Sequence, residues 1–102
     1  LYPMIFVDTI TPEPKPWRGR IVPANATDAN NWFTKTNGYN AFIMHYANLL
    51  GGDVDAFVIG SELVGMTSFT DSPGSYPAVS KLVTLAGSVK AAMPGTIITY
   101  AA

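Results

Sequence analysis

Residues 55–63 read Asp55-Ala56-Phe57-Val58-Ile59-Gly60-Ser61-Glu62-Leu63. The stretch begins as a nearly continuous apolar run and ends on two small residues and a carboxylate. A run that does not alternate with polar residues is typical of a strand covered on both faces, as in a parallel sheet. We therefore expect a buried strand over Ala56–Ile59, with Glu62 just beyond its carboxyl end.

The position of Glu62 suggests a role for its carboxylate. In α/β barrels the carboxyl ends of the strands carry the chemistry, because the loops there open into a shared cleft. Glu62 is then a functional carboxylate at this mouth, or else a surface residue that caps the following loop. The spacing alone does not distinguish these two interpretations.

The composition narrows the class of protein. At 102 residues the chain is one small domain or part of one, and because it opens at Leu1 without Met we expect a piece of a larger protein. It has a net charge of −1 and no basic patch, so nucleic acid is not an expected partner. Its apolar runs are too short to cross a bilayer, so no membrane partner is expected.

The sequence also lacks the usual signals for metals and cofactors. Without cysteine it has neither a disulfide framework nor a cysteine-based metal site. The motifs GxGxxG, GxxxxGK[ST] and HExxH are absent from the printed chain. We therefore expect no metal and no cofactor.

Two further strands and two helices surround the central run. Apolar and β-branched residues predict strands near 2–7 and 96–100, in addition to 56–60. Helical spacing of apolar residues predicts helices near 39–50 and 77–93. A strand–helix–strand–helix–strand order implies parallel strands with right-handed crossovers, in an open doubly wound sheet or in part of a barrel. A barrel requires both helices on one side of the strands.

The connecting segments are less regular. Three prolines between residues 12 and 16 predict an extended loop. A helical turn is expected around Asn31–Thr34, with Asp28 or Asn30 as its N-cap, and residues 64–76 are expected to form a loop. The apolar stripe of the second helix is predicted to comprise Val79, Leu82, Val83, Ala86, Val89 and Met93.

Several polar and aromatic residues are expected at the same rim as Glu62. They are Asp8, Trp17, Arg18, Arg20, Ser61 and Tyr100. An indole that stacks on a sugar ring, guanidiniums and carboxylates that bond hydroxyls, and a Glu that protonates a glycosidic oxygen would together suit a carbohydrate.

Each of these residues also has a purely structural interpretation. Trp17 would then be a loop anchor, Arg18 and Arg20 would form salt bridges to Asp8 or Glu62, and Asp8 would cap the rim. The only histidine, His45, falls on the first predicted helix, away from the strand ends, and is expected to be packed or solvated there.

Five segments, in order, resemble a single family. They are Pro16–Ile21, His45–Ala47, Asp55–Leu63, Tyr76–Val79 and Ile98–Ala102. The family is the TIM-barrel-like, glycoside-hydrolase-like domain of gene transfer agent and phage tail proteins. It is similar to (β/α)₈ glycosidases, including mannanases with a related Gly-Thr-Glu-Leu strand end.

The resemblance implies roles that the residues alone do not establish. Glu62 matches the general acid/base of a retaining glycosidase, and Ser61 stands where many such enzymes have an Asn that contacts the sugar 2-hydroxyl. Residues 1–102 would be a partial barrel holding strands three to five of eight, since a whole barrel takes about 250 residues. The nucleophile would come from a later strand, so the chain alone is expected to be inactive.

Two classes of function follow from the resemblance. In the first, the protein cleaves a cell-envelope glycan by retaining hydrolysis. In the second, it is a non-catalytic structural or host-recognition module that binds glycan. Either way the implied partners are cell-surface polysaccharide, other tail proteins and the rest of the barrel. The implied location is the tail of a phage-like particle made in the bacterial cytoplasm.

Overall fold

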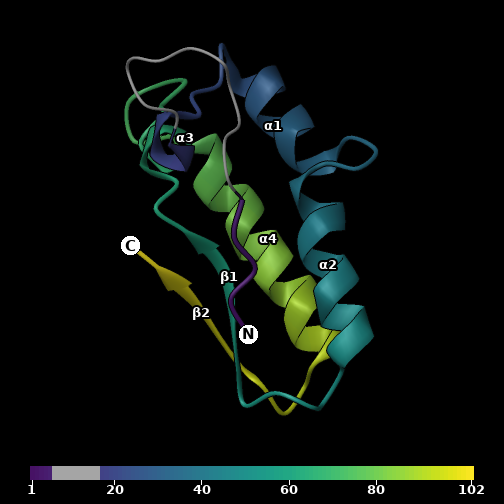
Figure 1. Ribbon diagram of the computed structural model, residues 1–102. Coiled ribbons are helices and arrows are strands. Elements are labelled where there is room, and N and C mark those ends of the chain that lie inside the picture. Colours follow the sequence, from purple (N-terminus) through teal and green to yellow (C-terminus); the bar gives the residue numbers. More distant parts are fainter. Residues whose placement is uncertain (6–16) are drawn as a thin grey trace.

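The computed structural model describes residues 1–5 and 17–102 (Figure 1). In chain order its elements are the 3₁₀ turn η1 (Arg18–Arg20), α1 (Ala26–Thr34), α2 (Tyr39–Leu50), β1 (Ala56–Ser61), α3 (Val64–Thr67), α4 (Pro77–Ala92) and β2 (Ile97–Ala101). The two long helices and both of these strands agree with the predicted bounds to within about a residue. The predicted Pro-rich loop, Asp8 and the end of the predicted first strand lie outside the described residues.

The strands β1 and β2 pair in parallel, as the alternation of elements predicts. Ala56 is opposite Ile97, and Val58 is opposite Thr99. The connection between them runs through α3 and α4, which is the crossover that parallel strands require.

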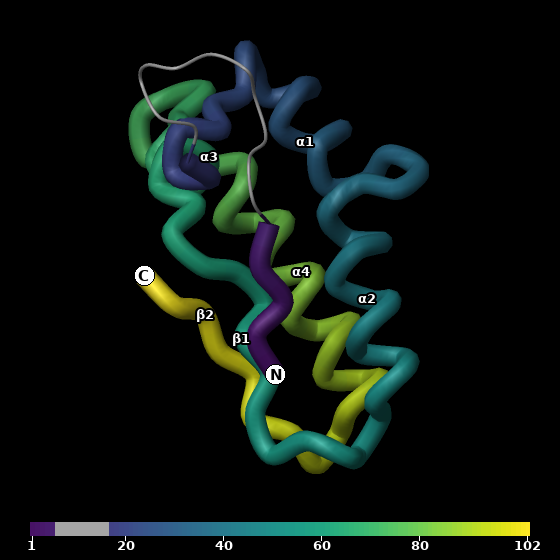
Figure 2. The backbone as a smooth tube through the Cα atoms, viewed as in Figure 1, coloured from purple at the N-terminus to yellow at the C-terminus, as the bar shows by residue number. Residues whose placement is uncertain are grey.

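The first residues of the chain lie along β1 (Figure 2). The Leu1 nitrogen donates to the Ala56 carbonyl at 2.7 Å, and the Val58 N–H donates to the Leu1 carbonyl at 2.9 Å. Because the neighbouring Asp55 carbonyl bonds Ile97 instead, and successive carbonyls point in opposite directions, β1 lies between Leu1 and β2. Of the predicted first strand, residues 2–5 are described and form no regular strand, whereas Leu1 before them makes two backbone hydrogen bonds to β1.

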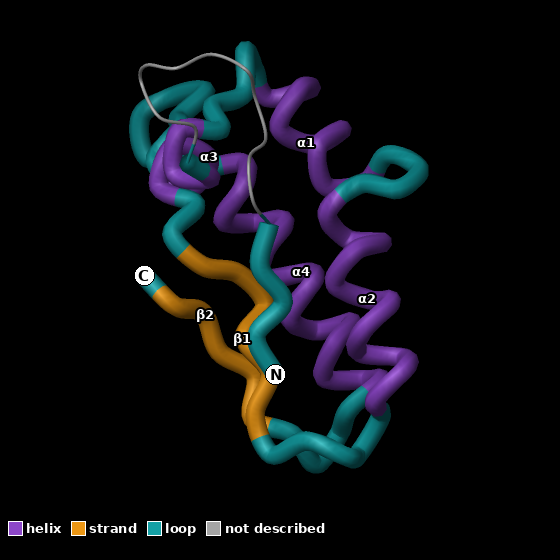
Figure 3. Tube along the Cα trace, viewed as in Figure 1, coloured by secondary structure: helices purple, strands orange, loops and turns teal. Residues whose placement is uncertain are grey.

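Both long helices lie on the same side of the strands, as a barrel segment requires (Figures 1 and 3). Helices α1, α2 and α4 contact one another and form this layer. The core between helices and strands contains Ala29, Phe33, Tyr39, Ile43, Ala47, Phe57, Ile59, Leu63, Met66, Ala78, Leu82, Leu85, Val89 and Met93. The observed architecture is thus α/β with parallel strands and helices on one face.

The predicted stripe of α4 is partly wrong. Leu82 and Val89 are buried as expected, but Val79 and Val83 are 42% and 68% exposed. The buried side is completed by Ala78 and Leu85, so the helix is rotated away from the predicted orientation. The two exposed valines line an apolar hollow of about 280 Å³ beside β2.

Helix α1 begins well before the expected helical turn. Its N-cap is Asn25, whose side chain accepts from the Asp28 N–H at 2.8 Å. The Asp28 carboxylate in turn accepts from the Ala24 N–H at 2.9 Å. This reciprocal arrangement resembles a capping box and explains why a polar, turn-like segment folds as helix. In the described ranges no helix is long and apolar enough to cross a bilayer.

Candidate functional site

The end of β1 is irregular. Three residues of β1, from Ile59 to Ser61, lie opposite two of β2, so the register shifts between Val58 and Ser61. This is a β-bulge, a device common at barrel rims and beside active sites. Because side chains alternate with a period of two, the extra residue places Ser61 on the same face as Val58 instead of on the helix-facing side.

Gly60 is the residue that makes the bulge sterically possible. A Cβ atom at this position would lie 2.9 Å from Cε2 of Tyr100 and 3.1 Å from the Tyr39 hydroxyl oxygen. Both distances are shorter than ordinary van der Waals contact. The small residue in the central stretch is therefore required by two tyrosines that pack against the backbone.

Glu62 directly follows the bulge in a left-handed backbone conformation, with φ of 53°. This region is unfavourable for residues with a Cβ and costs of order 1 kcal/mol. Two hydrogen bonds hold the backbone there: the Glu62 N–H donates to the Ala101 carbonyl at 3.0 Å, and the Leu63 N–H donates to the Tyr100 hydroxyl at 3.0 Å. Strain held by its surroundings in this way is characteristic of functional positions.

Arg18 and Trp17 contact the Glu62 carboxylate. The Arg18 Nη2 atom donates to Oε1 at 2.7 Å, and the Trp17 indole N–H donates to Oε2 at 3.1 Å. Arg18 also donates from Nε to the Ser61 carbonyl at 3.2 Å. The Arg18 side chain is 9% exposed and that of Glu62 is 42% exposed, so the carboxylate remains open to solvent beside a buried guanidinium. Of the partners predicted for Arg18, Glu62 is the one observed.

Two glycines bring this loop to Glu62. The Trp17 ring covers Gly19 so closely that a Cβ there would lie 2.2 Å from the indole. A Cβ on Gly65 of α3 would lie 2.7 Å from the Gly19 carbonyl and 2.8 Å from the Ile21 carbonyl. The absence of both side chains lets η1 dock against α3, which follows Glu62 in the chain.

The remaining predicted rim residues are distributed as follows. The Ser61 hydroxyl accepts a hydrogen bond from the Tyr2 hydroxyl, and Tyr100 supports the backbone of Leu63. Arg20 is exposed at the end of η1, and among the described contacts none joins it to Glu62. Asp8 lies outside the described residues. Sugar contact by any of these residues stays a prediction.

Outside this rim, His45 is exposed on α2, where its ring contacts Tyr46, consistent with the expected packed or solvated role. Residues 1–5 and 17–102 contain no group of three acidic, histidine or cysteine side chains that would hold a metal ion.

Comparison with protein families decides the classification. Residues 37–102 match the family of the GTA TIM-barrel-like domain. The chain belongs to this family. It is accordingly a TIM-barrel-like module related to gene transfer agents, as the five sequence segments indicated. No curated protein and no solved structure matches the chain.

The family match includes only part of the site. The match contains β1, Glu62, α4 and β2, whereas Trp17 and Arg18 precede it. The placement of these two residues on the carboxylate is thus a result of the structure rather than of the family match. Four residues of the site were missed from the sequence: Tyr2, Gly19, Tyr39 and Gly65.

Proposed function

We propose that the protein cleaves a cell-envelope glycan by retaining hydrolysis, with Glu62 as the general acid/base. The observation that carries this proposal is an accessible carboxylate, in a strained backbone conformation, at the carboxyl end of a buried parallel strand. That is the end of the strand where barrel enzymes carry their catalytic groups. The function extends beyond the family assignment and is our inference.

Arg18 and Trp17 would orient the carboxylate for this reaction. The Arg18 guanidinium bonds both the Ser61 carbonyl and Glu62, so it fixes the side chain relative to its own backbone. Trp17 is 39% exposed and lies beside the carboxylate, where its ring could stack on a sugar. Ser61, Arg20, Asp8 and Tyr100 are proposed as further sugar contacts.

The reaction also needs a second carboxylate. In retaining glycosidases a nucleophile lies about 5–5.5 Å from the acid/base and forms a covalent glycosyl intermediate. We propose that this group is supplied by a later strand of the barrel, of which the present strands are the third to the fifth. The tail of a phage-like particle, together with other tail proteins, is the proposed setting.

Two hollows support the proposal that further barrel units pack on this module. One, of about 280 Å³, lies between α4 and β2 and is almost entirely apolar. The other, of about 360 Å³, lies on the outer flank of α2 and is lined by Asn37, Ala41, Phe42, His45 and Tyr46. Neighbouring βα units of a barrel would cover both flanks.

The test is glycan cleavage by the intact protein carrying Glu62→Gln. We expect a loss of about 10²–10⁴ in rate, the usual contribution of a general acid/base. Asp71→Asn is the matched control, because Asp71 is an exposed carboxylate in the loop between α3 and α4. Full activity with Gln at position 62 would remove Glu62 from catalysis.

One observation favours glycan binding without cleavage. Both oxygens of Glu62 accept hydrogen bonds from side chains of the same loop, which is how a carboxylate is held in a recognition site. If the unmutated protein binds purified envelope polysaccharide but does not cleave it, and Trp17→Ala weakens that binding, the host-recognition function replaces the hydrolase.

A further inference from the structure

Two tyrosine hydroxyls hold the backbone on either side of Glu62. The Tyr39 hydroxyl donates to the Ile59 carbonyl at 2.8 Å, inside the bulge. The Tyr100 hydroxyl accepts from the Leu63 N–H at 3.0 Å, directly after Glu62. We infer that Tyr39 and Tyr100 are positioning residues, which keep the bulge and the left-handed turn in the form that places Glu62 on Arg18 and Trp17. The positioning itself does not depend on the proposed function, but its effect on catalysis does.

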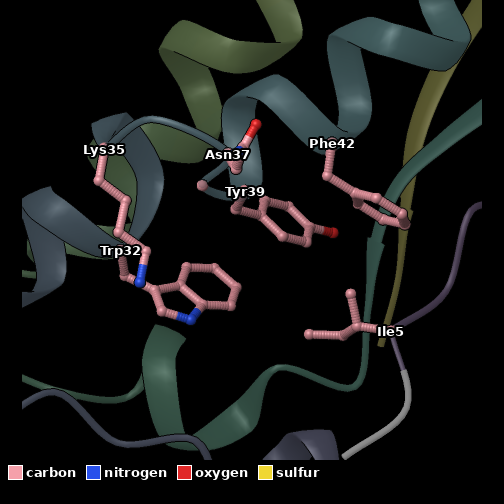
Figure 4. Close-up of a pocket in the computed structure, with 7 residues that line it drawn as sticks. Ile5, Trp32, Lys35, Asn37, Tyr39 and Phe42 are labelled. Carbon is pink, nitrogen blue, oxygen red and sulfur yellow. The ribbon is translucent and has the colours of Figure 1, made fainter.

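Aromatic rings pack against Tyr39. Its ring is stacked on Trp32, with centroids 4.7 Å apart and planes 15° apart, and meets Phe33 edge-to-face at 5.7 Å. Figure 4 shows the ring among Trp32, Phe42 and Ile5, with the hydroxyl directed toward the strands. A hollow of about 290 Å³, lined in part by Trp32, Phe42 and Ile5, lies beside the ring.

The protonation state of Tyr39 suits this role. Burial, followed by the neighbouring Tyr100, raises the pKa of Tyr39 well above its usual range. The hydroxyl therefore keeps its proton further into the alkaline range than an ordinary tyrosine does, and remains a donor to the Ile59 carbonyl. The bulge interrupts the regular ladder at this point, and the Tyr39 hydroxyl supplies a side-chain donor to it.

Tyr100 acts from the other strand. Its ring lies against Gly60, filling the space that a side chain would occupy, and its hydroxyl reaches past the bulge to Leu63. Both tyrosine side chains thus pack directly against Gly60. Removing a hydroxyl leaves each ring in place, which makes Phe a clean substitution at both positions.

The consequence for Glu62 follows from the two bonds of Arg18. One bond goes to the Ser61 carbonyl and the other to the Glu62 carboxylate, so their separation depends on the backbone between these residues. A change in the left-handed turn moves the carboxylate while leaving the Ser61 carbonyl in place. The Trp17 bond to Oε2 would be lost at the same time.

The experiment follows the Trp17 indole N–H by NMR in the intact protein, unmutated and with Tyr39→Phe, Tyr100→Phe or Tyr46→Phe. Glu62→Ala gives the resonance position without the Trp17–Glu62 bond, and Trp17→Phe assigns the signal. Tyr46 is the matched control, because it lies on the outer flank of α2 and its ring contacts Phe42 and His45.

We expect each positioning variant to move the resonance more than half of the way to its Glu62→Ala position, and Tyr46→Phe to leave it unchanged. Tyr100→Phe alone decides the matter if Tyr39→Phe does not fold, since Tyr100 is only partly buried. A resonance that stays in place in a folded Tyr100→Phe chain overturns the inference.

A second measurement separates this inference from the proposed function. In an active intact protein, Tyr39→Phe should lower kcat more than it raises KM, because Tyr39 is not among the proposed sugar contacts. If Glu62→Gln retains full cleavage, the proposed function fails, but the NMR outcome still decides whether the tyrosines position Glu62. Equal kcat and KM values for the Tyr100→Phe and unmutated proteins, in an enzyme that depends on Glu62, would overturn the catalytic consequence.

Discussion

The two ends of the β1–β2 pair are built differently. At the amino end, the buried Thr96 donates from Oγ1 to the Val54 carbonyl at 3.0 Å, and the Lys90 ammonium donates to the Thr96 carbonyl at 2.7 Å. The strands start in regular register there, with Ala56 opposite Ile97. At the carboxyl end, the register shifts, Glu62 adopts a left-handed conformation and a carboxylate meets a guanidinium.

The difference places regular backbone at one end of a short sheet and the proposed functional carboxylate at the other. Contacts at the amino end join α4 to the turn before β1 and satisfy backbone carbonyls without a left-handed residue among them. Contacts at the carboxyl end hold a strained residue so that its side chain stays exposed. This agrees with the general division in barrels, where one rim carries chemistry and the other carries stability.

The largest effect is expected from Gly65→Ala, which attacks the carboxyl end. The new Cβ would collide with two backbone carbonyls of the η1 loop, which cannot move as a flexible side chain would. We expect a destabilisation of about 1–3 kcal/mol in urea unfolding, the usual cost of overpacking. The Trp17 indole resonance should move to its Glu62→Ala position.

Gly87→Ala is the control for this prediction. Gly87 lies inside α4, and a Cβ atom added there would have no neighbouring atom within 4 Å, so Ala should stabilise the chain by about 0.5–1 kcal/mol. An unchanged Trp17 signal in Gly65→Ala would show that η1 does not depend on its docking against α3.

The sequence predicts the regular parts of this molecule better than its rim. The apolar run before Gly60 and the helical spacing of α2 identify elements because burial repeats with the period of the structure. The apolar run does not predict the bulge, because a strand with one extra residue has the same kind of sequence as a regular strand. Tyr39 fits the apolar face of α2, and periodicity does not reveal that its hydroxyl bonds a strand.

The sequence predicts only part of the site, because it reveals residue types and strand ends but not how loops dock. Residue type and position relative to a strand identified Glu62 as the candidate, and Arg18 was expected to pair with it or with Asp8. The contact with Glu62 depends on how η1 docks, which two glycines permit through close backbone contacts. Helix α3 was missed because four residues are too few to show a period.

A smaller effect is expected at the amino end, where the comparison can be tested independently. Thr96→Val keeps the shape of the side chain but removes the donor to the Val54 carbonyl. We expect a loss of about 1–2 kcal/mol in the free energy of unfolding, with the Trp17 resonance unchanged. Thr84→Val on the exposed side of α4 should have almost no effect. Movement of the Trp17 signal in Thr96→Val would mean that the two ends are coupled.

The smallest effect measures the strain at Glu62 directly. Both Glu62→Ala and Glu62→Gly remove the carboxylate, but only glycine adopts the left-handed conformation without a Cβ penalty. We expect the Gly variant to be the more stable of the two by about 1 kcal/mol in thermal or urea unfolding. The same pair at Ser88 within α4 should show the opposite order, because glycine weakens a helix. Greater stability of Glu62→Ala would contradict the assigned backbone strain.

The bulge at Gly60 also affects how many residues related barrels can have in this strand before the glutamate. Ser61 shares a face with Val58 although two residues separate them, because the bulge absorbs one of the two. A strand one residue shorter would reach the same face by regular alternation, without the bulge and without a need for the Tyr39 hydroxyl. A strand one residue longer would also reach that face by regular alternation, but its glutamate would then lie two residues further along β2. In an alignment of such barrels, deletions just before the glutamate should therefore be accompanied by loss of the hydroxyl at position 39.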